Sequence, residues 1–202
     1  MFNSRIYWRI WIITGILIFI FITLFKGLEL NVILITTAIS AAGISLLIEA
    51  LLFKQFIWKK FPNIFYPWLC SIPFIGGRWE GTVQSDYIFP DTGEKSGPIP
   101  ASMDIKHEFD KITVTLETGK SYSSSYVSDI WIDEADRKYL CYTYYNDADE
   151  NRDKNPNHDG TAKLRILKDS NEEIILEGHY FTGRKTSGKM TFRRIDKNNS
   201  KV

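Results

Sequence analysis

The sequence contains few cysteines and has almost no net charge, and each of these features excludes a class of protein. Its 202 residues include two cysteines, Cys70 and Cys141. Two are too few for a disulfide framework, and such a low count suits a reducing compartment. The formal net charge is only +1, whereas a nucleic-acid polymer usually requires a clustered basic face. We therefore expect no nucleic-acid polymer as a partner, although this charge is compatible with a small anionic ligand.

The sequence also lacks the motifs of common catalytic sites. It contains no phosphate-binding glycine loop, no nucleophile elbow and no paired-histidine metalloprotease motif. The three histidines, His107, His158 and His179, lack the spacing of metal ligands. We therefore predict that the chain is not an enzyme and that it holds no cofactor and no metal ion.

One acidic loop has a partial likeness to a calcium site. Asp147, Asp149 and Asn151 match the first ligand positions of a calcium-binding loop. Arg152, however, stands where a glycine must form the sharp turn, and His158 stands where a bidentate glutamate is needed. The loop that contains these residues is therefore predicted to be the exposed tip of a hairpin.

The N-terminal third consists of two long apolar runs. No charge lies between Ile10 and Phe25, and Glu49 is the only charge between Leu30 and Leu52. A bilayer core is crossed by about 20 apolar residues in a helix. We therefore predict a transmembrane hairpin over residues 1–60, with spans at about 8–26 and 30–53. A signal peptide is the alternative, but no small-residue cleavage site is present and a second apolar run follows at once.

Basic residues flank the hairpin on one side. Arg5 and Arg9 precede the first run, and Lys54, Lys59 and Lys60 follow the second. Because basic flanks remain in the cytoplasm, both termini and the domain that follows are predicted to be cytoplasmic.

A stripe of mostly small residues runs along the second span at every fourth position: Thr37, Ala41, Ser45 and Glu49. Small residues let helix backbones approach closely, and a carboxylate at this depth usually faces protein or water. The simpler interpretation is packing within the hairpin, with Glu49 reaching the cytoplasmic interface. Packing between copies of the chain is the alternative.

The segment 61–77 mixes aromatic residues with three prolines. Prolines prevent one long helix here. We expect a juxtamembrane collar in the headgroup region, which forms the domain boundary.

The remaining sequence alternates between apolar and polar residues, and Gly, Asp, Asn and Pro separate the alternating segments. Short strands joined by tight turns favour an antiparallel meander that closes into a barrel. A two-sheet sandwich is the alternative. The barrel is predicted over residues 78–195, followed by a disordered tail at 196–202. The eight predicted strands are Arg78–Asp86, Ile99–Glu108, Lys111–Glu117, Ser123–Ile132, Lys138–Asn146, Thr161–Lys168, Ile174–Thr182 and Lys189–Arg194.

The face that we assign to the barrel interior changes character along its strands. It is apolar at one end and grades into Tyr144, Asn146, Tyr180 and Thr182 at the other, with Arg184 in the next loop. An eight-stranded barrel can hold one small ligand at its mouth, or it can fill with side chains. Both outcomes stay open, because tyrosine hydroxyls at the rim of a solid core would simply reach solvent.

Four motifs, in this order after the hairpin, carry a resemblance to a known family: GRWEG, the L-x-Y-x-Y-x-N run, HDGTAKL, and LEGHYFTGR with the GKM that follows it. They lie at Gly77–Gly81, Leu140–Asn146, His158–Leu164 and Leu176–Met190. With the two-helix N-terminus, the chain resembles the membrane effectors of bacterial cyclic-oligonucleotide antiphage defence (CBASS). The type is the two-transmembrane, β-strand-rich effector associated with SMODS nucleotidyltransferases.

The resemblance implies that one chain both binds the signal molecule and kills the cell. In that family the barrel binds a cyclic dinucleotide, the protein self-assembles, and its helices disrupt the inner membrane, which kills the cell. A nucleotidyltransferase that makes the ligand is a functional partner without required direct contact. The alternative function is a membrane-tethered, lipocalin-like carrier of a small apolar ligand.

Strand alternation also suggests which residues meet the ligand. Tyrosine rings can stack on bases, cations can face phosphates, and an amide or a hydroxyl can read base edges. The predicted ligand-binding residues are Tyr142, Tyr144, Asn146, Tyr180, Thr182, Arg184 and Lys185.

Overall fold

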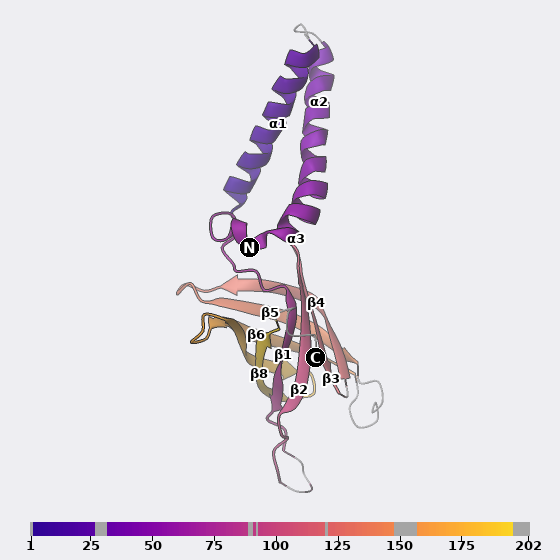
Figure 1. Cartoon of the computed structure of the whole chain (residues 1–202). Coiled ribbons are helices and arrows are strands. Elements are labelled where there is room, and N and C mark those ends of the chain that lie inside the picture. Colours follow the sequence, from indigo (N-terminus) through magenta and orange to yellow (C-terminus); the bar gives the residue numbers. More distant parts are fainter. Residues whose placement is uncertain are drawn as a thin grey trace, which may run out of the picture. The chain divides into compact units, whose positions relative to one another are not determined.

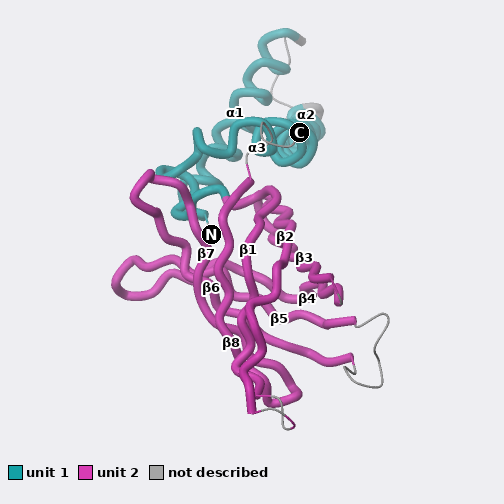
Figure 2. Tube along the Cα trace, turned by 60° about the horizontal axis from the view of Figure 1, so that its bottom comes forward, with its two compact units in different colours: residues 1–74 teal, residues 75–202 magenta. Residues whose placement is uncertain are grey.

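The computed structural model describes residues 2–26, 32–88, 91, 93–119, 121–147 and 157–195. The chain divides into two compact units, residues 1–74 and 75–202 (Figure 1 and Figure 2). Our predictions for the turn between the apolar runs, for the tip of the acidic loop and for the C-terminal tail lie outside the described residues.

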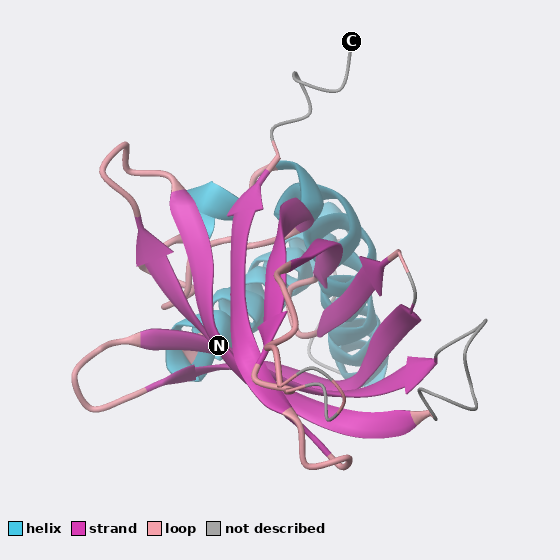
Figure 3. Ribbon diagram, turned by 90° about the horizontal axis from the view of Figure 1, so that it is seen from below, coloured by secondary structure: helices cyan, strands magenta, loops and turns pink. Residues whose placement is uncertain are grey.

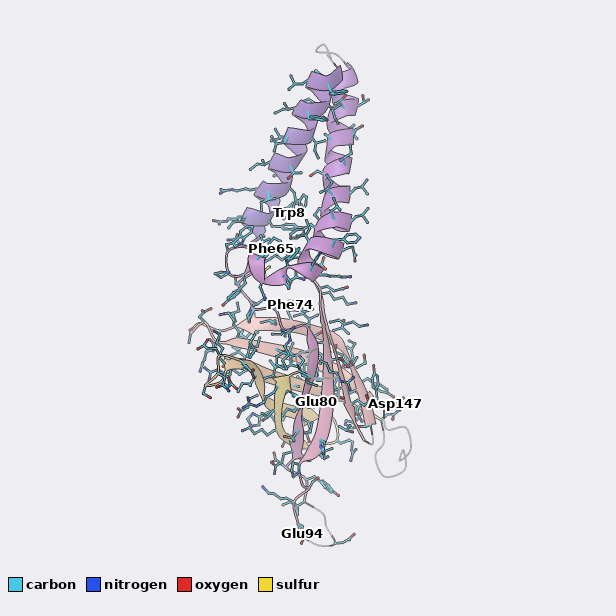
Figure 4. The ribbon with its side chains drawn as sticks, in the orientation of Figure 1. Trp8, Phe65, Phe74, Glu80, Glu94 and Asp147 are labelled. Atoms are coloured by element: carbon cyan, nitrogen blue, oxygen red, sulfur yellow. The ribbon has the colours of Figure 1, made fainter. Side chains whose placement is uncertain are left out.

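The first unit is helical (Figure 1). Two of its stretches, Ser4–Phe25 and Leu34–Lys60, are long and apolar enough to cross a membrane. Many of their large apolar side chains are exposed, and Figure 4 shows side chains projecting outward from both helices. The elements are α1 (Ser4–Lys26), α2 (Val32–Leu47), the π-helix η1 (Ile48–Ile57), α3 (Trp58–Lys60) and the 3-10 helix η2 (Pro62–Phe65).

The second helical stretch runs past the predicted end of its span at residue 53. It continues as η1 and α3 as far as Lys60. Phe61 then leaves the helical region, with φ −133° and ψ 48°. The reason is local, because the ring of Pro62 disfavours a helical conformation at the residue before it.

The small residues of α2 lie against α1. Thr37, Ala41 and Ser45 are all buried. The Ser45 hydroxyl donates to the carbonyl of Trp11 (3.1 Å), and a Cβ built on Gly15 would lie 3.8 Å from Ser45 Cβ. Within this unit, the stripe is therefore part of the contact between the two helices of the hairpin.

Glu49 continues this stripe in η1 and is held by polar partners. It accepts a hydrogen bond from the Tyr7 hydroxyl and pairs with the Lys54 ammonium (3.0 Å). Just before α1, the Asn3 N–H donates to the carbonyl of Leu69 (2.8 Å). These contacts tie the N-terminus, η1 and the segment after η2 into one unit.

The second unit is a closed barrel of eight antiparallel strands, seen from below in Figure 3. Each strand pairs with the next, and β1 pairs with β8 to close the barrel. The predicted eight-stranded antiparallel barrel is confirmed, and the two-sheet sandwich was the wrong alternative. The strands are β1 (Gly77–Ser85), β2 (Ile99–His107), β3 (Ile112–Thr118), β4 (Ser121–Ile132), β5 (Lys138–Asp147), β6 (His158–Lys168), β7 (Ile174–Thr182) and β8 (Ser187–Arg194).

The barrel interior is a packed apolar core over most of its length. Trp79, Leu140, Leu164, Leu176 and Phe192 have no exposed surface. Each comes from a different strand and lies on the face that alternation assigned to the interior. Full burial of side chains of this size stabilises the fold by roughly 1.5–3 kcal/mol each.

Two strands contribute inward residues that alternation did not assign. In β2, Ala101, Met103 and Ile105 are buried. In β4, a bulge between Ser125 and Val127 shifts the pairing register. Because an extra residue reverses the alternation that follows it, a simple period-two pattern cannot identify the inner face of β4.

Candidate functional site

One end of the barrel is sealed by large side chains that bond to the backbone. Trp79 Nε1–H donates to the carbonyl of Ile75 (3.0 Å), and the Ile75 N–H donates to Nδ1 of His107 (3.2 Å). Phe109, in the β2–β3 turn at the same end, is also buried. Burial lowers the pKa of His107 from 6.5 to about 4, because the charged imidazolium loses its hydration there.

The opposite end is open and contains a pocket of about 260 Å³. Its floor is apolar and includes Val83, Leu116 and Met190. Its walls are rich in hydroxyl groups, from Ser85, Ser96, Ser121, Ser123, Thr182 and Thr186. We call this pocket the mouth pocket.

Two tyrosine rings lie on the wall of the mouth pocket because each faces a glycine on a neighbouring strand. Tyr144 pairs with Gly160 across β5 and β6, and Tyr180 pairs with Gly188 across β7 and β8. A Cβ on either glycine would overlap the facing ring. Glycine at these positions therefore lets each ring lie against the neighbouring backbone.

The β7–β8 turn supplies the cation of the mouth pocket. The hydroxyls of Thr182 and Thr186 are 2.6 Å apart, and the Lys185 N–H donates to the carbonyl of Thr182 (3.0 Å). Lys185 has a positive φ of 60°, which a tight turn imposes. Arg184 precedes it and lines the pocket.

The electrostatics of the mouth pocket favour an anion. Among the described lining residues, Arg184 carries the only permanent charge, and none is a carboxylate. Burial, and next the neighbouring Tyr180, raise the pKa of the Tyr144 hydroxyl, which therefore stays protonated at neutral pH and can donate a hydrogen bond. The pocket thus combines flat rings, hydrogen-bond donors and one cation.

Five of the seven residues that we predicted to bind ligand line this pocket together: Tyr144, Asn146, Tyr180, Thr182 and Arg184. Tyr142 lies deeper in the barrel, is 2% exposed, and donates from its hydroxyl to Met190 Sδ (3.8 Å). Its ring centroid is 5.7 Å from that of Tyr144. Lys185 is exposed and lies outside the described lining.

Other lining residues were missed by the sequence analysis. Tyr87 and Ser96 belong to the connection between β1 and β2, where alternation carries no information. Ser121 and Ser123 begin β4, and His158 begins β6 earlier than we predicted. The serine-rich start of β4 was the available signal, because small hydroxyl residues at inward positions of a strand indicate a polar cavity.

A closed barrel with one sealed end and one polar, tyrosine-lined mouth belongs to the class of barrels that hold a single small molecule. No group of three or more His, Cys, Asp or Glu suited to a metal ion occurs among the residues described.

Comparison with known families then identifies the barrel. Residues 70–194, which include all eight strands, match the family described as "Cap15, cyclic dinucleotide receptor domain". The chain belongs to this family, and the resemblance seen in the sequence is confirmed. The chain is also 31% identical over 162 residues to "CD-NTase-associated protein 15" of Yersinia aleksiciae. This match covers 78% of this chain and 71% of the relative.

Proposed function

We propose that this protein is a CBASS effector whose barrel binds a cyclic dinucleotide at the mouth pocket, without chemical turnover. The observation that carries the proposal is the match of the entire barrel to a cyclic dinucleotide receptor family. The pocket geometry supports it, because the ligand would bring two bases and two phosphates to a site that offers rings and a cation.

The contacts that we assign to the ligand follow from the chemistry of the lining. Tyr144 and Tyr180 present ring faces for base stacking, which contributes ~1–3 kcal/mol per base. Arg184 faces a phosphate, and Asn146 and Thr182 bond to base edges or the sugar. Two stacked bases and one charge-assisted phosphate contact are together enough for about micromolar affinity.

A lipocalin-like carrier of an apolar molecule accounts less well for the mouth pocket. An apolar ligand would displace water from the hydroxyl and amide groups of the wall without offering them hydrogen bonds, and a polar group that loses water in this way costs free energy. A wholly apolar lining would have favoured the carrier, and this lining is mixed.

The same proposal assigns a task to the helical unit. The hairpin spans the inner membrane of a bacterium with both termini and the barrel in the cytoplasm, and a separate nucleotidyltransferase makes the ligand. Ligand binding drives self-assembly, and the assembled hairpins disrupt the bilayer. A ligand that binds the assembled form ~100-fold more tightly supplies about 2.7 kcal/mol per site, so several sites must act together to make a sharp switch.

Neighbouring tyrosines on β5 provide a matched test of ligand binding. Tyr144 is in the mouth pocket, whereas Tyr145 points outward and is 47% exposed. We expect isothermal titration of the detergent-solubilised full chain against a panel of cyclic dinucleotides to identify one that binds. Tyr144→Ala should then weaken affinity about 5- to 150-fold, and Tyr145→Ala should leave it unchanged. Binding of no cyclic dinucleotide, or equal losses in both variants, would refute the proposed site.

Neighbouring small residues on α2 test the role of the hairpin. Ser45 is 4% exposed against α1, whereas a side chain added at Gly43 would meet nothing within 4 Å. Ser45→Leu should separate the helices and abolish ligand-driven toxicity in cells while ligand affinity is retained. Gly43→Leu places the same side chain at an open position and should not have this effect. If Gly43→Leu abolishes toxicity and Ser45→Leu does not, the interface that matters lies on the outer face of α2.

A further inference from the structure

The outer wall of the barrel over β5 to β8 carries a basic hollow of about 460 Å³ that the mouth pocket does not use. Strand register brings its cations together. Lys163 pairs with His179, which pairs in turn with Lys189, and Arg165 pairs with Tyr139 in the next row. We call the following six residues the basic wall: Tyr139, Lys163, Arg165, His179, Phe181 and Lys189.

Aromatic rings are interleaved with these cations. Lys163 Nζ lies 4.3 Å from the centroid of the Trp131 ring and 4.4 Å from that of Tyr139. Trp131 is 49% exposed and Phe181 is 62% exposed, although both are large and apolar. Exposed tryptophan and phenylalanine beside lysine and arginine are typical of surfaces that meet the lipid headgroup region.

The opposite wall of the same barrel differs. The outward residues of β1 to β3 alternate in charge, as with Arg78, Glu80 (labelled in Figure 4), Asp104 and Lys106. Among the described residues of these three strands, Ile99 at the start of β2 is the only exposed large hydrophobic side chain. The basic wall is therefore a local specialisation and not the general character of the barrel surface.

The charges on the basic wall select its partner. The carboxylate of Glu177, which also lines the hollow, is paired with Lys189 (2.5 Å), so Lys163 and Arg165 give the wall a net positive charge. An anionic bilayer presents negative charge over the whole area of contact with the basic wall. The β1–β3 wall of a second copy would present the cations Arg78 and Lys106 as well as carboxylates. Each cation near an anionic leaflet favours contact about fivefold.

The chain also keeps the barrel near a bilayer if the hairpin is anchored as proposed. The second apolar helix ends at Lys60 and β1 begins at Gly77. A tether of this length gives a high effective concentration, so a contact that is weak for a free domain becomes substantial.

We propose that the basic wall binds the surface of an anionic lipid bilayer, with phospholipid phosphates at Lys163 and Arg165 and the Trp131 and Phe181 rings at headgroup depth. This contact rests on the proposed anchoring of the hairpin and not on nucleotide binding. It holds one side of the barrel against the membrane while the mouth pocket remains available to a soluble ligand.

Lysine footprinting of the full chain tests the proposal. The protein is reconstituted at one copy per nanodisc, in phosphatidylcholine alone or with about one third phosphatidylglycerol, and lightly acetylated before mass spectrometry. Lys163 and Lys189 should react at least ~3-fold more slowly in the anionic discs, because Lys163 favours the anionic surface about fivefold and Lys189 lies within the same contact. Lys106, exposed on the opposite wall, is the internal control and should not change. The protection should disappear at about 1 M salt, where the screening length is ~3 Å.

Charge reversal sharpens this result. In the full chain, Lys163→Glu with Arg165→Glu should remove the protection of Lys189, and cyclic dinucleotide titration should be unchanged, which also reports that the barrel is folded. Equal labelling in both lipid mixtures would overturn the proposal. Protection that appears only when several copies share one bilayer would overturn it as well, because the wall would then be an interface between copies.

Discussion

The two ends of the barrel are made by the same eight strands, yet one end is sealed and the other holds a pocket. Strand β5 shows the change residue by residue. Its inward side chains run from Leu140, with no exposed surface, through Tyr142 and Tyr144 to Asn146 at the mouth. A closed barrel can therefore assign stability to one end and recognition to the other by changing residue type along each strand.

The largest expected effect comes from removing the side chain that fills the sealed end. Trp79 has no exposed surface, and we expect Trp79→Ala to lower the free energy of unfolding by ~3–5 kcal/mol. Losses of this size are a large fraction of the stability of an ordinary domain. Chemical denaturation of the full chain in detergent measures the loss.

Trp131→Ala is the matched control, because Trp131 lies on the outer wall and is 49% exposed. Losing its contact with Lys163 should cost ~1 kcal/mol or less. If the free energy of unfolding falls equally in the two variants, the sealed end does not contribute more to stability than the outer wall.

The sealed end should also be sensitive to acid. The pKa of His107 is lowered to about 4 in the folded barrel, so below its ordinary value of 6.5 the unfolded chain binds a proton that the folded chain does not. The contribution of His107 to stability is therefore complete above pH 6.5 and is lost as the pH falls toward 4. The total loss is about 3 kcal/mol.

His107→Asn isolates this effect, because the amide oxygen can still accept the Ile75 N–H but does not titrate. Between pH 7.5 and pH 4.5, the variant should lose less stability than the wild type in parallel denaturation curves. Carboxylates contribute to both proteins and cancel in the difference. Identical pH profiles would mean that His107 is hydrated in the folded barrel.

Much of the fold and part of the site could be predicted from the sequence, for a physical reason. In β5, β6 and β7 the core requires apolar side chains at every second position, so the pattern identifies both the strands and their inner faces. This is why Tyr144, Asn146 and Tyr180 were correctly placed on one interior surface.

The remaining features depend on tertiary contacts that no local pattern encodes. The bulge between Ser125 and Val127 shifts the register of β4, so one period-two pattern cannot identify its inner face from end to end. Tyr87 reaches the pocket from an irregular connection. Lys185 directly follows Arg184 in sequence, but the turn takes it out of the lining. A hydropathy pattern cannot assign direction within a turn, where backbone conformation determines where a side chain points.

The most direct test of the account is to map where the ligand attaches. A photoreactive azido analogue of the cyclic dinucleotide that binds in titration is irradiated with the full-length protein, and the modified peptides are identified by mass spectrometry. We expect attachment within β5 near Tyr144 and within the β7–β8 turn near Arg184, with competition by the unmodified ligand. Competed attachment at the sealed end near Trp79, on the basic wall or in the helical unit would contradict it.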